Sequence, residues 1–139
     1  MLSIVDWYRS DQWSGTVDQS DDLMEDRHDY IQWLFPLTER SLAVPWAPVL
    51  TAPDLGVIRA DPVIQDRMRV STARMMLFYA RTSAWKRAND HNHLRITRIL
   101  KSLTLVGQRA EAEAFRAWLL RQGPDATAVT LRFWEEATR

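Results

Sequence analysis

The stretch NHLRITRILKSLTLVG, residues 92–107, carries the clearest sign of the fold. Its apolar residues recur every three or four positions, as they do on one face of an α-helix: Ile96, Ile99, Leu100, Leu103 and Val106. Asn92 can cap the start of such a helix, and Gly107 can end it. The sequence therefore predicts an amphipathic helix from Asn92 to Gly107.

Helical periodicity continues on both sides of this stretch. Before it, four residues can cap the starts of helices: Ser3, Ser20, Thr51 and Asp61. The helix after Ser20 is predicted to run to Pro36 and to be deeply buried, and a loop is predicted over 14–20. Further on, Gly123-Pro124 closes one helix and Asp125 begins the last one. No convincing strand pattern is present, so we predict an all-α fold, a compact bundle of about six to seven helices.

The apolar positions also predict which faces of two helices point into the core. In the helix after Ser20 the inward positions are Leu23, Met24, His28, Ile31, Leu34 and Phe35. In the long helix after Asp61 they are Val63, Val70 and Leu77, at seven-residue spacing, beside Ile64, Met68, Met75 and Tyr79. We expect both rows to be shielded from water.

Length and composition indicate one globular domain over residues 1–139, because 46% of the 139 residues are hydrophobic and 26% are charged. The chain has no cysteine, which excludes disulfides, thiol catalysis and zinc sites built on cysteine. It has neither the run of about 20 apolar residues that a transmembrane helix needs nor a secretion signal at its start. We therefore expect a cytoplasmic protein.

Charge is distributed unevenly along the chain. Residues 1–66 hold twelve acidic and four basic residues, and residues 67–139 hold six acidic and fourteen basic ones. The two halves therefore carry −8 and +8, and either they neutralise each other or a basic face remains for an anionic ligand. The formal net charge of zero argues against a nucleic-acid-binding protein.

Two runs of sequence resemble the conserved region of the opioid growth factor receptor family. HDYIQWLFPL, residues 28–37, is similar to the family signature H-x-Y-I-Q-W-L-F-P-L. NHLRITRILKSL, residues 92–103, is similar to the second signature, N-x-L-R-I-T-R-I-L-K-S-L. Three shorter motifs also resemble the family and occur in the family's order along the chain: IVDWYR at 4–9, Phe78-Tyr79, and LRFW at 131–134. The connection over 80–90 is shorter than the family's usual one.

The resemblance implies a stand-alone, single-domain, receptor-like module with a peptide-binding heritage. The vertebrate family member is associated with an enkephalin pentapeptide and with growth control. The resemblance implies no catalytic residues, because none are established for the family. It leaves the oligomeric state and any protein partner open.

We therefore predict a site for a short peptide or a small anionic ligand, in a cleft between the helices that carry the two signatures. Its candidate residues are His28, Tyr30, Trp33, His93, Arg95, Arg98 and Lys101. The last three form a cationic row along one helix, and arginine binds carboxylates and phosphates through paired donors. The alternative is a structural row that pairs with the acidic half, for instance with Asp29 or Glu25. In either case we expect the helix starting near Asp21 to pack against the helix starting near Asn92.

The seven tryptophans divide into two groups. Trp33, Trp118 and Trp134 lie on apolar stripes and are expected in the core. Trp46 and Trp85 lie in predicted loops, where an indole covers an apolar gap or lines a binding groove. Trp85-Lys86-Arg87 is only a fragment of the aromatic and basic pattern that nucleic-acid binding needs, so we predict no nucleic-acid partner.

Signs of catalysis are few. The sequence lacks a phosphate loop, a dinucleotide glycine pattern and a nucleophile elbow, so the interpretation favours a binding module over an enzyme. The alternatives are a hydrolase or transferase with His28 or His93 as the base, or a protein that holds haem or a metal through these histidines. Because His91-Asn92-His93 is weak metal-ligand spacing and no carboxylate is clearly paired with it, we predict no metal and no cofactor.

Overall fold

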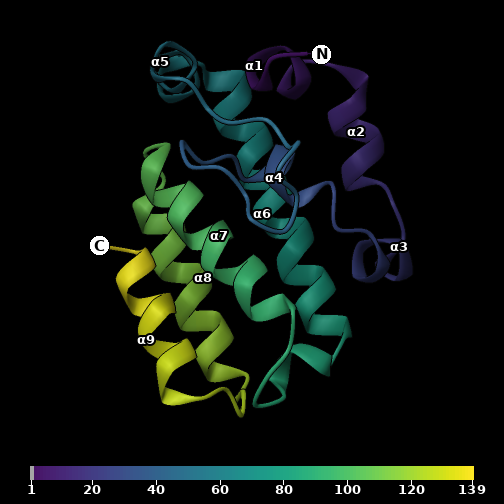
Figure 1. Cartoon of the computed structure of the whole chain (residues 1–139), viewed down its shortest axis with the longest axis vertical. Coiled ribbons are helices and arrows are strands. Elements are labelled where there is room, and N and C mark those ends of the chain that lie inside the picture. The colour runs from purple at the N-terminus through teal and green to yellow at the C-terminus, as the bar shows by residue number, and fades with distance from the viewer. Residues whose placement is uncertain (1) are drawn as a thin grey trace. The chain divides into compact units, whose positions relative to one another are not determined.

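The computed structural model describes residues 2–139, which form nine α-helices and one short 3₁₀ helix and contain no strand (Figure 1). The all-α prediction is confirmed, with more helices than the six or seven expected. The chain divides into two compact units, the first ending at Arg74 and the second beginning at Met75. Each unit is described separately below, and a single domain over 1–139 stays a prediction. No helix of this described part is long and apolar enough to cross a membrane.

The first unit contains six helical segments: α1 (Ile4–Tyr8), α2 (Asp11–Val17), α3 (Asp21–Asp26), α4 (Ile31–Leu34), α5 (Ala52–Ala60) and the first part of α6 (Pro62–Arg81). Ser3, Ser10, Ser20 and Thr51 each cap a helix with a side-chain oxygen that accepts a backbone N–H of the first turn. Helix α1 contacts α2, α4 and α5 (Figure 1). The caps at Ser3, Ser20 and Thr51 confirm the predicted helix starts.

Helix α2 corrects the prediction of a loop over 14–20, because residues 14–17 are helical. Ser10 begins the helix by accepting the N–H of Gln12 at 3.2 Å. Trp13 is buried and donates its indole N–H to Ser71 at 3.0 Å. The helix therefore depends on a contact with a residue far along the chain, which the glycine and polar residues of the local sequence do not reveal.

The helix predicted from Ser20 to Pro36 is broken in the middle. Helix α3 ends at Asp26, residues 27–30 are not helical, and α4 begins at Ile31. The phenol of Tyr30 donates a hydrogen bond to the carbonyl of Met24 at 2.6 Å, which folds the chain back across the break. The prediction that His28 and Leu23 point inward is wrong, since both are exposed. The remaining inward positions are buried as predicted: Met24, Ile31, Leu34 and Phe35.

A buried polar cluster ties α1 and α2 to α6. The Tyr8 hydroxyl donates to the carbonyl of Leu34, and its oxygen lies 3.1 Å from Ser71 Oγ. Arg67 donates to the carbonyl of Tyr8 at 2.7 Å and lies over the Trp13 ring, 4.5 Å from its centroid. Burial raises the pKa of Tyr8 well above its usual value, so this hydroxyl stays protonated and remains a donor.

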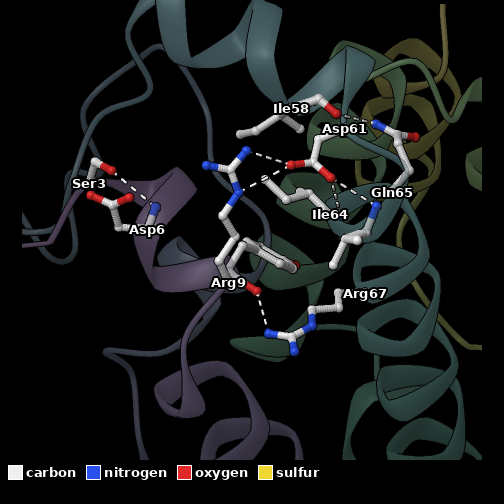
Figure 2. A network of polar contacts seen from close by, with 10 residues as sticks. Ser3, Asp6, Arg9, Ile58, Asp61, Ile64, Gln65 and Arg67 are labelled. Carbon is white, nitrogen blue, oxygen red and sulfur yellow. Dashed lines mark hydrogen bonds and ion pairs between the residues drawn. The ribbon is translucent and has the colours of Figure 1, made fainter.

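Asp61 lies at the junction of α5 and α6 and has two roles there (Figure 2). Its Oδ1 accepts the N–H groups of Val63 and Ile64 at 2.9 and 3.3 Å, which confirms it as the predicted cap of α6. Its Oδ2 accepts Nη2 and Nε of Arg9 at 2.6 and 3.1 Å. This pairing with Arg9 is the main reason that the pKa of Asp61 is lowered.

The core-facing row of α6 is as predicted at Ile64, Met68, Met75 and Tyr79, which are all buried. Val63, Val70 and Leu77 are about half exposed, so the prediction that they point inward is wrong. The buried row runs through Ile64, Met68, Ser71, Thr72, Met75, Phe78 and Tyr79. Small hydroxyl residues occupy part of the inner face because their side chains bond to carbonyls one turn earlier, as Ser71 does to Arg67. The seven-residue spacing of Val63, Val70 and Leu77 therefore marks a neighbouring face, because the hydroxyl residues of the inner face are absent from an apolar pattern.

The second unit contains the end of α6, the 3₁₀ helix η1 (Ala84–Lys86), α7 (Asn92–Leu105), α8 (Arg109–Arg121) and α9 (Ala128–Ala137). Helix α7 contacts both α8 and α9 (Figure 1). All five apolar residues of its predicted stripe are fully buried: Ile96, Ile99, Leu100, Leu103 and Val106. Gly107 and Gly123 have φ angles of 93° and 69°, so they end α7 and α8 in the left-handed conformation that glycine adopts without strain.

Two predicted helix starts in this unit are corrected. Asn92 is the first residue of α7 and not its cap, and its N–H is accepted by the carboxylate of Asp90 at 3.0 Å. Helix α9 begins at Ala128 and not at Asp125, because the hydroxyl of Thr127 accepts the N–H of Thr130. In both cases a nearby polar side chain provides the cap in place of the residue predicted.

Candidate functional site

The first unit contains a pocket of about 590 Å³ formed by α1, α2, α3, α4 and the connections between them. Its lining residues are Trp7, Gln12, Gly15, Thr16, Asp18, Gln19, Leu23, Arg27, Asp29, Tyr30 and Trp33. This volume lies within the range of about 300–1,000 Å³ that is usual for ligand pockets. Aromatic, amide, hydroxyl and charged groups all contribute to the lining, as in a site that binds an amphipathic ligand.

One wall of the pocket is aromatic. The indoles of Trp7 and Trp33 are stacked, with their ring centroids 5.5 Å apart and their planes inclined by 27°. Trp7 is buried, whereas Trp33 is only partly buried. Tyr30 is fixed by its hydrogen bond to Met24. Trp33 therefore offers the accessible part of an aromatic surface that its neighbours hold in place.

The polar side of the pocket contains an ion pair. Arg27 donates Nε and Nη2 to the two carboxylate oxygens of Asp29, at 3.2 and 3.3 Å. Its Nη1 donates to Oε1 of Gln19 at 3.4 Å. Both charged side chains are about half exposed. The amide nitrogen of Gln19 is buried and has no hydrogen-bond partner, so one N–H donor group of the lining is unsatisfied.

The connection between α2 and α3, which carries two lining residues, is held by Arg74. This arginine donates to the carbonyls of Val17 and Gln19 at 3.1 and 2.9 Å, and to Asp21 at 2.8 Å. Charge-assisted bonds of this kind are stronger than neutral ones. Gln19 is therefore presented from a fixed backbone, although the connection has no regular secondary structure.

Two of the predicted site residues of the first signature line this pocket, and one does not. Tyr30 and Trp33 are lining residues. His28 is exposed in the break between α3 and α4 and is not among the lining residues. Sequence reasoning missed Trp7, Gln19 and the α2 residues as site residues. Trp7 belongs to the IVDWYR motif, which the sequence connects only with the family resemblance.

The predicted site residues of the second signature have different environments. His93 is buried, its Nε2 lies 2.7 Å from the carbonyl of Trp85, and its ring packs edge-to-face on Trp134 at 5.6 Å. Arg95 is also buried and donates Nη1 to the side-chain oxygen of Asn92 at 3.4 Å. A metal or haem iron bound at Nε2 of His93 would have to displace the contact with Trp85.

The cationic row is not uniform. Arg95 is buried, Arg98 is half-buried and Lys101 is exposed, so the three side chains do not share one environment. The two signatures belong to different units. A cleft between their helices, the packing of these helices and the binding of an anion by the row therefore stay predictions.

The other tryptophans considered in the sequence differ in burial. Trp85 is fully buried in η1 and donates Nε1 to the carbonyl of Tyr79 at 2.8 Å, which corrects its assignment to a loop. Trp118, partly buried, stacks on Trp85 with centroids 6.5 Å apart. Trp134 is fully buried, whereas Trp46 is 72% exposed. Within residues 2–139, no three His, Asp or Glu side chains are grouped as they would be to hold a metal ion.

A comparison with protein families matches residues 9–86 to the family described as the opioid growth factor receptor (OGFr) conserved region. This match covers more than half of the chain. The chain belongs to this family. Apart from Trp7, every lining residue of the pocket lies within the matched segment, as does the first signature. The second signature, at 92–103, lies beyond it.

Individual family members give the same result. The human opioid growth factor receptor is 40% identical over 127 aligned residues, which cover 78% of this chain and 18% of the human protein. The mouse opioid growth factor receptor-like protein 1 is 31% identical over 127 residues, covering 79% of this chain and 25% of that protein. The chain thus spans only about a fifth to a quarter of the length of these relatives. No solved structure matches it.

Proposed function

We propose that this chain is a receptor-like binding module that takes a short peptide in the pocket between α1, α2, α3 and α4. One observation carries the proposal: Tyr30 and Trp33 of the first signature meet Trp7 of the opening motif in the lining of one pocket. The relatives of the chain are named as receptors for an opioid growth factor. The first signature thus contributes two of the three aromatic residues of the pocket, and the opening motif contributes the third.

The groups that line the pocket suit a peptide better than a small anion. A peptide carries one donor and one acceptor on each residue. The lining offers the amide of Gln12, the amide N–H donor of Gln19, and the hydroxyl oxygen of Thr16 as an acceptor, since that hydroxyl already donates to the carbonyl of Gln12 at 2.7 Å. The carboxylates of Asp18 and Asp29 outnumber the one guanidinium, which disfavours an isolated anion. The proposed partner is therefore a peptide, and an anion remains a proposal only for the row on α7. We further propose a cytoplasmic location, in keeping with the cysteine-free sequence.

Isothermal titration of an enkephalin pentapeptide into the purified protein tests this proposal. We expect saturable binding that is lost in Trp33→Ala, because this variant removes the accessible aromatic surface of the pocket. Trp46→Ala is the matched control, since Trp46 is an exposed tryptophan outside the lining. Equal loss of affinity in both variants would contradict a site at Trp33.

A second pair of variants tests the pocket itself. Gly15 lines the pocket and Gly56 lies in α5, and a Cβ atom added to either glycine would meet no atom within 4 Å. Gly15→Leu is expected to fill part of the pocket and abolish binding, whereas Gly56→Leu is expected to bind as the unmodified protein does. Full affinity in folded Gly15→Leu would show that the peptide binds elsewhere.

A further inference from the structure

We propose that the pocket selects a peptide by a positively charged group, and that the Arg27 guanidinium occupies the position of that group in the free protein. The inference rests on the peptide-binding function proposed above and specifies the chemistry of the ligand. It follows from three properties of the pocket: its charge, the weakness of its internal ion pair and its unsatisfied amide.

The charge around the pocket is negative. Between residues 18 and 29 there are six acidic residues and one arginine. Of the charged lining residues, Asp18 and Asp29 are acidic and only Arg27 is basic. Arg74 offsets one further carboxylate, that of Asp21. An excess of carboxylates at the mouth of a cavity attracts cations and repels anions.

The Arg27–Asp29 pair has the geometry of a ligand contact but not the strength of a permanent one. The guanidinium contacts both oxygens of Asp29 and the amide oxygen of Gln19, as a bound cationic group would. Both charged side chains are about half exposed, and ion pairs so well solvated contribute little to stability. An incoming ammonium or guanidinium group can therefore take over these acceptors when Arg27 swings into solvent.

The other lining groups complete a site for a charged peptide residue. The indole of Trp33 lines the pocket, and an indole attracts a cation placed over its ring. The N–H donor group of Gln19 is buried and has no partner in the free protein, and a peptide carbonyl can accept it once Arg27, which contacts the oxygen of the same amide, has moved away. The recognised unit is thus a cation with a neighbouring carbonyl. Such a unit occurs at a free peptide amino terminus and at a lysine or arginine residue.

Titrations with matched peptides distinguish these two sources of charge. The first peptide is a pentapeptide that has a free amino terminus and no charged side chains. The second is the same peptide with its amino terminus acetylated. The third is the acetylated peptide with one lysine residue added. Loss of binding on acetylation identifies the terminal amine, and recovery with lysine shows that a side-chain cation is accepted as well. Affinity is expected to fall as salt is raised, since the site is partly exposed.

Two variants test the role of Arg27. Arg27→Gln is expected to tighten binding of the charged peptides about two- to fivefold, because the ligand no longer competes with an exposed ion pair. Asp29→Asn is expected to weaken it about tenfold, because a charge-assisted hydrogen bond is lost. The control variants are Arg69→Gln and Asp66→Asn, which alter a similarly exposed ion pair outside the pocket and should leave affinity unchanged.

The outcomes separate this inference from the proposed function. If the charged and acetylated peptides bind equally well, or if Arg27→Gln weakens binding, the inference is overturned and peptide binding itself stands. If none of the peptides binds to the unmodified protein or to Arg27→Gln, the proposed function is overturned as well. Circular dichroism of each variant confirms that the helices are intact before its affinity is compared.

Discussion

Trp7 and Trp33 stack on each other with their ring centroids 5.5 Å apart. Trp7 belongs to α1 and Trp33 to α4, and these two helices are in contact. The stack therefore joins the IVDWYR and HDYIQWLFPL motifs and also forms the aromatic wall of the pocket. Because aromatic pairs add about 0.5–1.5 kcal/mol beyond their buried area, the same contact contributes to the fold and to the site.

Replacing Trp33 by alanine should destabilise the protein less than replacing a fully buried tryptophan. Replacing a fully buried tryptophan by alanine lowers the free energy of unfolding by about 3–5 kcal/mol. Trp134 is fully buried, so we expect a loss of this size for Trp134→Ala. For the partly buried Trp33 we expect about 2 kcal/mol. Urea denaturation of the two variants checks the order. Equal costs would mean that Trp33 is a core residue and offers no surface to a ligand.

Ser71→Ala should be costly although it removes only one oxygen atom. Ser71 accepts the indole N–H of buried Trp13 and lies within hydrogen-bond distance of the Tyr8 hydroxyl. Leaving the Trp13 donor unsatisfied is expected to cost about 1–3 kcal/mol of the free energy of unfolding. The control is Ser83→Ala, at an exposed serine whose side chain makes no capping hydrogen bond. This variant should change the free energy of unfolding by less than about 0.5 kcal/mol. A cost for Ser71→Ala as small as that of Ser83→Ala would refute the hydrogen-bond network.

The Arg9–Asp61 pair should make stability depend on pH in the acidic range. Because the pKa of Asp61 is lower in the folded protein than in the unfolded chain, folding is favoured above the unfolded value of about 3.9. This contribution is lost as the pH falls through the lowered pKa of the folded state. In Arg9→Gln, stability should be lower at neutral pH and should fall less steeply on acidification. Thermal melts at a series of pH values, with Arg69→Gln as the control, measure both effects, and an unchanged slope in Arg9→Gln would contradict the assignment.

Members of the cationic row on α7 should respond differently to neutralisation. Arg95 is buried and bonded to Asn92, so Arg95→Gln is expected to cost about 1–3 kcal/mol of stability. Lys101 is exposed, and Lys101→Gln should change stability by less than about 0.5 kcal/mol. Thermal melts compare the two variants. Strong destabilisation by both would show that the row is structural along its whole length and would end its candidacy as an anion site.

The helices that could be predicted from the sequence are those whose signals are local. The stripe of α7 and the caps at Ser3, Thr51 and Asp61 lie within a few residues of the structure they specify. Helix α2 has no such local signal, because the Trp13–Ser71 hydrogen bond that supports it spans 58 positions of sequence. Local patterns carry no information about such a distant partner.

The candidate site could be predicted only in part for a related reason. The first signature predicts Tyr30 and Trp33 as site residues, and both line the pocket. His28 belongs to the same run, but the break at residues 27–30 leaves it exposed. The helical spacing of apolar residues continues from the residues before this break to those after it, so the spacing does not show that the helix ends there. The roles of Arg27 and Gln19 depend on that turn and emerge only from the folded chain.

The most direct test of the central claim is the ¹H–¹⁵N spectrum of the tryptophan indole groups during titration with an enkephalin pentapeptide. The seven tryptophans include two pocket residues, Trp7 and Trp33. We predict that their two indole signals shift, whereas the signals of four tryptophans outside the pocket stay in place: Trp46, Trp85, Trp118 and Trp134. Shifts confined to those four tryptophans, or no shift at any of the seven, would contradict peptide binding in this pocket.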